Sequence, residues 1–192
     1  MKVRDSGMPN EKMWESFFRI ENIFQLLEID SNIFDLVEIG CGYGTFTIPA
    51  STLIKGEILA FDIESEMIEV VKQKAIEKGV NNIVLENRDI LSNTTGLPNV
   101  SVDYVILFNL LHNETPKDFL NEAYRILKPG GKLGIIHWRS DVETPRGPDL
   151  TIRPKPEEII GIIDENKFDI KLQPFILEPY HFGILLIKNK NK

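Results

Sequence analysis

The stretch that decides the fold is Val37-Glu38-Ile39-Gly40-Cys41-Gly42-Tyr43-Gly44, in which a short apolar strand runs into a loop with three glycines. Glycines in such a loop let the backbone turn tightly and let a ligand approach main-chain N–H groups. Loops of this kind at the carboxyl ends of parallel strands are where α/β sheets bind nucleotides. A dinucleotide fingerprint, G-x-G-x-x-G, would require glycine where Thr45 stands. The loop therefore favours a nucleoside over a pyrophosphate ligand.

Two carboxylates follow the next two predicted strands. Asp62 ends the strand over residues 58–61, and a carboxylate there can accept two hydrogen bonds from a ribose diol. Asp89 follows the strand over 83–85 and could accept from the exocyclic amine of adenine, while the N–H of Ile90 meets a ring nitrogen. Each carboxylate alone could be a turn or helix-cap residue. The glycine loop and both carboxylates at the ends of successive strands together predict an adenosine site.

Apolar patterns of strand and helix type alternate along most of the chain. Strands are predicted at 34–39, 58–61, 83–85, 104–108 and 132–138, and helices at 11–28, 65–78 and 115–127. This alternation implies a parallel sheet with helices on both faces. After a proline-rich loop and a short helix near 157–165, strands near 167–173 and 181–187 are too close for a parallel crossover. We predict an α/β, Rossmann-like fold with seven strands, mostly parallel, and an antiparallel last strand.

One domain is predicted over residues 1–192, because no linker, repeat or low-complexity segment divides the chain. Residues 1–30 would form an N-terminal helical lid and residues 31–138 the cofactor-binding core. Residues 139–192 would supply a substrate loop and the C-terminal antiparallel strands. The segment that starts at 139 is unusually long and polar for a connector, which is typical of a substrate loop.

Composition narrows the functional classes. The chain has 42% hydrophobic and 27% charged residues and a formal net charge of −7, without a basic stripe, so nucleic acid is disfavoured as a partner. It has no apolar run of about 18 residues, so membrane insertion is not expected. The N-terminus does not resemble a signal peptide. A single cysteine, Cys41, suits a cytoplasmic location. The oligomeric state is left open.

Five segments, taken together, resemble the class I S-adenosylmethionine-dependent methyltransferases. They are Val37–Gly44, Phe61-Asp62, Asn87-Arg88-Asp89-Ile90, Phe108-Asn109-Leu110-Leu111-His112 and Arg125–Leu133. The resemblance covers roughly residues 30–138. It is strongest to the ubiquinone/menaquinone-biosynthesis type, which acts on small molecules. It implies S-adenosylmethionine as the cofactor and a small-molecule acceptor as the partner.

The resemblance also implies site residues. The three glycines would pass under the cofactor, Glu38 would lie near its amino group, and the backbone of Asn109 would lie near its methionyl ammonium. Asp62 would bind the ribose. The cofactor-binding set is Glu38, Gly40, Cys41, Gly42, Gly44, Asp62, Ile63, Asp89, Ile90 and Asn109. Within the loop Cys41 is expected to fit sterically, not to act as a reactive thiol.

The acceptor side is predicted from residue type and position. A phenol or enol acceptor would profit from a general base, which suits His112 and His137 on the rim where the acceptor should enter. His181 is a weaker candidate. Trp14 in the predicted lid could contact the acceptor, and Arg139 or Arg146 in the substrate loop could receive an acidic group. No metal-ligand cluster has the right spacing, so no metal is expected.

Several alternatives stay open. The chain could methylate RNA or a protein side chain, or it could bind the cofactor without catalysis. Amino-group methylases of nucleic acid carry an Asn/Asp-Pro-Pro-aromatic run after the fourth strand, where this chain has Asn109-Leu110-Leu111-His112. A nicotinamide-dependent dehydrogenase is the weakest alternative, because Thr45 breaks its fingerprint.

Overall fold

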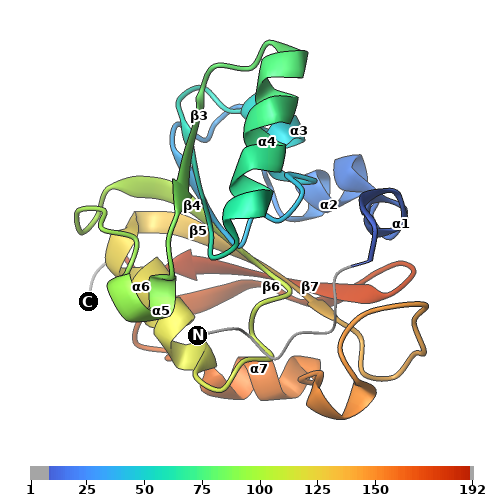
Figure 1. Cartoon of the computed structure of the whole chain (residues 1–192). Coiled ribbons are helices and arrows are strands. Elements are labelled where there is room, and N and C mark those ends of the chain that lie inside the picture. Colours follow the sequence, from blue (N-terminus) through green and yellow to red (C-terminus); the bar gives the residue numbers. More distant parts are fainter. Residues whose placement is uncertain (1–8, 191–192) are drawn as a thin grey trace.

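The strands of this chain form one mixed sheet in the order β3-β2-β1-β4-β5-β7-β6 (Figure 1). The structure is a computed structural model, and it describes residues 9–190. The strands are β1 Leu36–Ile39, β2 Ile58–Asp62, β3 Ile83–Asn87, β4 Val102–Phe108, β5 Leu127–Trp138, β6 Phe168–Leu177 and β7 His181–Lys188. Strands β1 to β5 pair in parallel, and β7 lies antiparallel between β5 and β6. The predicted fold class is confirmed.

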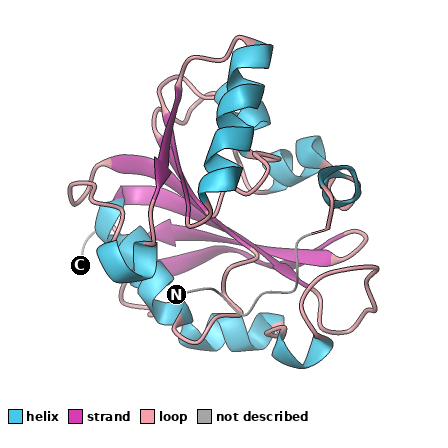
Figure 2. Ribbon diagram, in the orientation of Figure 1, coloured by secondary structure: helices cyan, strands magenta, loops and turns pink. Residues whose placement is uncertain are grey.

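Helices cover both faces of the sheet (Figure 2). They are α1 Glu11–Glu15, α2 Ile20–Leu26, α3 Thr47–Ser51, α4 Ser65–Lys78, α5 Ile90–Asn93, α6 Pro116–Ile126 and α7 Pro156–Ile162, with a 3₁₀ turn η1 at Leu150–Ile152. One apolar cluster contains side chains of α2, α3 and α4, and Trp14 of α1 packs against it. A second cluster contains side chains of α5, α6 and α7. The sheet separates these two halves of the core.

The single helix predicted over residues 11–28 is wrong. The segment forms two short helices, α1 and α2, separated by a turn at residues 16–19. The hydroxyl of Ser16 donates to the carbonyl of Met13 at 2.7 Å, which competes with continuation of the helix. The break lets the consecutive residues Phe17 and Phe18 both be buried, which the surface of one regular helix would not favour.

Several strands extend beyond their predicted bounds, β5 furthest, since it begins at Leu127 instead of residue 132. Strand β3 includes Glu86 and Asn87, because its ladder with β2 continues after the apolar run ends. Strand β6 runs to Leu177, and its pairing with β7 is irregular between Leu172 and Phe175, where Pro174 lies. Proline is tolerated there because β6 is an edge strand. The apolar runs therefore located these strands but not their ends.

The strand order decides where a ligand can bind. The carboxyl ends of β1 to β5 meet at one edge of the sheet, and β1 and β4 are the neighbours at which the chain order reverses. Open parallel sheets bind ligands in the crevice at such a switch point. Loops after β3 and β2 reach one end of this crevice, and loops after β4 and β5 reach the other.

Candidate active site

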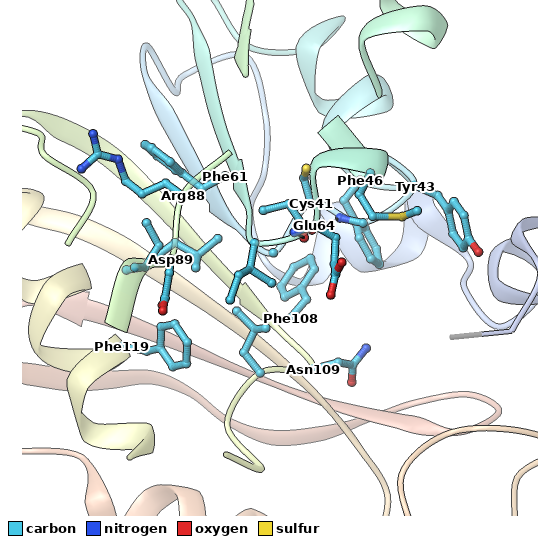
Figure 3. Close-up of a pocket in the computed structure, with 18 of the residues that line it drawn as sticks. Cys41, Tyr43, Phe46, Phe61, Glu64, Arg88, Asp89, Phe108, Asn109 and Phe119 are labelled. Carbon is cyan, nitrogen blue, oxygen red and sulfur yellow. Dashed lines mark hydrogen bonds between the residues drawn. The ribbon is translucent and has the colours of Figure 1, made fainter. Parts of the chain in front are cut away.

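A cavity of about 370 Å³ lies at the carboxyl edge of the sheet. Its walls come from the segments that follow β1, β2, β3 and β4, from Trp138 at the end of β5, and from the N-terminal residues Pro9 and Trp14. Figure 3 shows Arg88, Asp89 and Phe119 at one end of the cavity and Tyr43 and Asn109 at the other. The strand order thus brings the segments singled out in the sequence to one place.

The glycine loop turns back on itself below the cavity. Gly40, Gly42 and Gly44 have φ angles of +79°, +50° and +75°, which only glycine adopts readily. The N–H groups of Gly40 and Cys41 donate to the carbonyl of Phe61 at 2.7 and 3.0 Å, which joins the loop to the end of β2. A Cβ atom at Gly44 would lie 3.0 Å from Val71 of α4. The three glycines are therefore required by the conformation of the loop and by its packing.

Asp62 links this loop to the next strand. Its Oδ2 accepts from the N–H of Gly42 at 2.8 Å, and its Oδ1 accepts from the N–H of Glu64 at 2.9 Å. Burial raises the pKa of Asp62 above its usual range, and the two backbone bonds oppose that shift. A carboxylate has about four acceptor positions, so these bonds fix its orientation and leave it able to accept from a diol. Its carboxylate lines the cavity, as expected for a ribose-binding residue.

Glu38 lies beneath the loop and not on the wall of the cavity, and its position near a ligand amino group stays a prediction. It is 1% exposed, and it is not among the residues that line the cavity. The hydroxyl of Thr47 donates to its Oε2 at 2.5 Å. Burial raises the pKa of Glu38 to about 8, and the nearby charge of Asp62 adds to the shift. Glu38 therefore supports the loop from below.

Asp89 is a helix cap and also lies at the cavity, so its two predicted roles are compatible. It is the N-cap of α5, where its Oδ1 accepts from the N–H groups of Leu91 and Ser92 at 3.0 and 3.4 Å. Asp89 also lines the cavity, together with Ile90, Ile63 and Cys41 (Figure 3). The helix cap fixes the carboxylate at the rim, within the end of the cavity expected to hold adenine.

Cys41 is a steric component of the loop. It is 4% exposed. Burial raises the pKa of its thiol, and the charges of Glu38 and Asp62 raise it further. The thiolate is the nucleophilic form of cysteine, so a protonated, buried Cys41 is not a nucleophile at neutral pH. This agrees with the sequence-based expectation.

Asn109 is the polar residue of the cavity with the clearest unmet hydrogen bonds. Its backbone has a φ of +58°, and its N–H donates to the carbonyl of Ile136 at 2.7 Å. The nitrogen and the oxygen of its side-chain amide are both buried and have no partner within the protein. A buried polar group without a partner costs about 1–3 kcal/mol. Because neither amide atom is accessible from the cavity, the side chain does not mark a ligand position, and the role of the Asn109 backbone near a methionyl ammonium stays a prediction.

The two histidines predicted on the rim differ in position. His112 lines the cavity. His137 is fully buried, does not line the cavity, and places its Nε2 3.3 Å from Nδ1 of His112. Burial lowers the pKa of His137 to about 3, and the charges of His112 and Arg153 lower it further. The expected rim position of His137 is therefore wrong, and only His112 of the pair can face a ligand.

His181 belongs to the core. Its ring lies 4.3 Å from that of Trp138 and 4.6 Å from that of Phe18, measured between centroids. It is fully buried, and neither ring nitrogen has a hydrogen-bond partner in the described structure. Burial lowers its pKa well below the ordinary value. A neutral histidine thus takes the place of an apolar ring in the aromatic packing.

The end of the cavity beside β4 and β5 is aromatic. Trp14, Phe46, Phe108 and Trp138 line it, and the rings of Trp14 and Trp138 meet edge to face at 5.9 Å. Trp14 thus lies at this end of the cavity, and its contact with an acceptor stays a prediction. Neither Arg139 nor Arg146 lines the cavity.

The positions expected for the two loop arginines are therefore corrected. Arg139 is bonded to Asp141 at 2.9 and 3.0 Å and faces Glu178 at 3.6 Å. Arg146 is exposed, and the next residue, Gly147, contributes to the wall in its place.

Comparison with known proteins identifies the family. Residues 36–131, half of the chain, match the model of the family described as Methyltransferase domain. The chain belongs to this family. The resemblance to class I S-adenosylmethionine-dependent methyltransferases is thereby confirmed.

Relatives of this chain include the ubiquinone/menaquinone biosynthesis C-methyltransferase UbiE of Pasteurella multocida. It is 32% identical over 116 residues, which cover 57% of this chain and 42% of that protein. The chain spans about two fifths of the length of the curated relatives that head the comparison. A methyltransferase described as uncharacterized, from Schizosaccharomyces pombe, is 30% identical over 57% of this chain and 40% of its own.

The fold of this chain also matches solved structures. The crystal structure of a SAM-dependent methyltransferase from Aquifex aeolicus superposes with a TM-score of 0.81 at 22% identity. The superposition covers 93% of this chain and 94% of that one. At this identity the match supports the seven-stranded fold.

The residues at the cavity fit S-adenosylmethionine. The glycine loop offers a close backbone approach, and Asp62 lies where its carboxylate could accept from a diol. In the described part of the chain no group of three or more His, Cys, Asp and Glu side chains could hold a metal ion. No described helix is long and apolar enough to span a bilayer.

Sequence reasoning missed several residues that line the cavity. Among them are three apolar residues, Phe46, Met67 and Phe108. In the sequence an apolar side chain within a motif cannot be distinguished from a core residue. Arg88 stands inside the quoted segment Asn87–Ile90 and lines the cavity, where it pairs with Glu86 at 2.6 Å. Its position between two strand-end residues was a usable signal.

Proposed function

We propose that this chain transfers the methyl group of S-adenosylmethionine to a small, uncharged acceptor with an aromatic or other planar ring. The observation that carries the proposal is the two-part cavity. The glycine loop, Asp62 and Asp89 line one end, and aromatic rings line the other. No described arginine or lysine side chain lines the aromatic end. An anionic acceptor would therefore find no charge partner among the described residues there.

A carbon atom is the acceptor that we favour. The relative from Pasteurella multocida is named a C-methyltransferase. An electron-rich ring carbon suits a pocket of aromatic walls, because such a ring packs edge to face or offset against them. RNA and protein side chains, and cofactor binding without transfer, are the alternatives. The cytoplasmic location expected from the single cysteine stays a prediction.

The proposed chemistry needs little from the protein beyond alignment and proton removal. When bound, the cofactor supplies an electrophilic methyl group on a sulfonium. The acceptor atom forms its bond to the methyl carbon while the bond from sulfur to that carbon breaks. The aromatic walls exclude water and orient the acceptor, which is the main source of acceleration in a transfer of this kind. A proton lost by the acceptor would pass to His112, which reaches the cavity.

The experiment that tests the proposal is thermal unfolding with S-adenosylmethionine, S-adenosylhomocysteine or NAD. A ligand at about 100 times its Kd stabilises a protein by roughly 2.7 kcal/mol. For a domain of this size the expected rise in Tm is about 5–11 °C. A rise with both sulfur nucleosides and none with NAD supports the cofactor assignment, and the absence of a rise in folded protein would contradict it.

Transfer itself is tested with cofactor labelled on its methyl group. The acceptor panel should contain neutral phenols and quinols, acidic phenols, RNA and an unrelated protein. We expect label in the neutral ring compounds. Label in RNA or protein alone would replace the proposed acceptor class, and binding without any label would favour a module that binds the cofactor without catalysis.

The proposed role of His112 as a proton acceptor can be tested separately. Replacing His112 with glutamine should lower kcat by about 100-fold, the scale of general acid–base catalysis. The Kd for S-adenosylhomocysteine should stay within about twofold, because the glycine loop and Asp62 are untouched. Single-turnover transfer with the labelled cofactor measures the first quantity, and calorimetric titration measures the second. An unchanged kcat would remove His112 from the chemistry.

A further inference from the structure

The segment that connects β5 to η1 contributes to the aromatic end of the cavity. It covers residues 139–149 and follows Trp138, and both Trp138 and Gly147 line the cavity. Arg139 and Arg146, the arginines that the sequence singled out in this segment, do not line it. A third arginine, Arg153, lies just after η1 and is only 6% exposed.

The guanidinium of Arg153 is bonded to four positions along this segment. Its Nε donates to the carbonyl of Pro148 at 2.9 Å. Its Nη1 donates to the carbonyls of Arg139 at 2.9 Å and Val142 at 3.3 Å. Its Nη2 donates to the hydroxyl of Thr144 at 2.6 Å. Arg153 thus joins the start, the middle and the end of the segment from one point.

These bonds are unusual for a buried arginine. A buried charge is normally paired with an opposite charge. Among the described residues, no carboxylate forms an ion pair with Arg153, and all four acceptors are backbone carbonyls or a hydroxyl. The rigid fork of donors in a guanidinium can satisfy several carbonyls at once, and a lysine cannot reproduce that geometry. The arrangement therefore organises a loop.

Arg153 also contacts the wall of the cavity. Its guanidinium carbon lies 5.3 Å from the ring centroid of Trp138, within the range of a cation–π contact. The backbone of Gly147 packs on the same ring, since a Cβ atom there would lie 3.1 Å from it. Gly147 also has a φ of +124°, which other residues rarely adopt. One side chain thus fixes both the loop and the ring against which the loop packs.

We propose that Arg153 is a positioning residue that sets the shape of the acceptor end by holding residues 139–149 against Trp138. Arg153 does not line the cavity, so it acts through Trp138 and Gly147. The inference rests on the proposed function, because it takes the aromatic end of the cavity as the place of the acceptor. We call the hydrogen bonds of Arg153 to this segment the clamp. Loss of the clamp is expected to loosen the acceptor end of the cavity and to leave the cofactor end intact.

The first test measures the loop directly and needs no turnover. Arg153→Met is compared with Lys155→Met, which removes an exposed cation two residues away. Limited digestion with trypsin reports cleavage after Arg146, which is exposed and precedes Gly147. Trypsin does not cleave before proline, so Arg153, which precedes Pro154, is not a site in either protein.

We expect Arg153→Met to be cut after Arg146 about tenfold faster than the wild type, because cleavage follows local opening of the loop. Lys155→Met should be cut at the rate of the wild type. Equal rates for Arg153→Met and the wild type would overturn the proposal.

The second test separates positioning from general destabilisation. Arg153→Met should raise the acceptor KM by about tenfold, with kcat within roughly threefold and the Kd for S-adenosylhomocysteine within roughly twofold. Arg153→Lys should restore little, because it keeps the charge and loses the fork. If kcat, KM and cofactor affinity all worsen together, or if Arg153→Lys restores the acceptor KM fully, Arg153 is structural or acts by charge alone, and the proposal fails.

Two possible outcomes of these tests require an additional measurement or a separate interpretation. If circular dichroism shows that Arg153→Met is unfolded, Thr144→Val replaces it, because it removes one acceptor of the clamp. Thr144→Val should then raise the rate of cleavage after Arg146 and the acceptor KM by about threefold each. No change in either quantity would overturn the proposal. If the wild type binds cofactor but methylates nothing in the panel, the proposed function fails, and the digestion still decides whether Arg153 holds the loop.

Discussion

Replacing Asp62 with alanine is expected to weaken the binding of S-adenosylhomocysteine by about 100-fold, which corresponds to roughly 2.7 kcal/mol. Two losses add to this effect. The carboxylate no longer accepts from a ribose diol, and its bonds to the N–H groups of Gly42 and Glu64 disappear, so the glycine loop loses its side-chain link to the end of β2 and keeps only the backbone bonds to Phe61. A hydrogen bond to a charged group contributes about 1.5–3 kcal/mol.

Calorimetric titration with S-adenosylhomocysteine measures this change. Glu69→Gln serves as the control, because it also removes one carboxylate and lies on an exposed part of α4. The Kd of the control should equal that of the wild type. An Asp62→Ala variant that is folded and binds within threefold of the wild type would show that the adenosine end of the cavity has been assigned to the wrong residues.

The second large effect is a loss of stability in acid. His137 and His181 are fully buried, and burial depresses the pKa of both, that of His137 to about 3. In the unfolded chain a histidine has a pKa of about 6.5. Between pH 6.5 and about 3 the unfolded chain therefore binds more protons than the folded one. The free energy of unfolding should fall with falling pH, by about 1.4 kcal/mol per unit for each such histidine.

Glu38 contributes in the opposite sense above pH 4.5. Its folded pKa, about 8, exceeds its ordinary value of 4.5, so its contribution to stability falls as the pH rises between these values. Of these three groups, the two histidines outweigh Glu38 up to pH 6.5, and above it only Glu38 still contributes to the pH dependence. The free energy of unfolding should therefore be largest near pH 6.5.

Urea unfolding between pH 4 and pH 8 measures this profile. The informative variant is His181→Phe, because the ring of His181 is packed between aromatic rings and its nitrogens bond nothing in the described structure. Phenylalanine should preserve stability at pH 7 and lower the slope below pH 6.5 by about 1.4 kcal/mol per pH unit, the share of one histidine. A wild-type profile that is flat from pH 4 to pH 6.5 would contradict the buried neutral state of both histidines.

The cofactor end of the site could be predicted from the sequence because local rules decide it. Positive φ angles require glycine at Gly40, Gly42 and Gly44, and a strand must end where a loop of that kind begins. Asp62 and Asp89 then follow from the ends of the next two strands in a parallel sheet. Such features depend on neighbours in the chain, so a short segment carries them.

The acceptor end could be predicted only in part, because tertiary packing decides it. His137 and Trp138 are adjacent on β5, so their side chains point to opposite faces, and only Trp138 lines the cavity. Likewise, which of three arginines is buried depends on how the loop folds over Trp138. Nothing in the residues around Arg153 distinguishes it from Arg139 or Arg146. The break between α1 and α2 has the same origin, since it serves to bury Phe17 and Phe18.

The contact between Trp14 and Trp138 has a practical consequence. They are the only two tryptophans in the chain, and both line the cavity. Light absorbed selectively by indole therefore excites only the walls of the acceptor end, and the emission reports what enters it. Candidate acceptors can be ranked by the quenching they cause, with unlabelled protein and without any transfer of methyl groups.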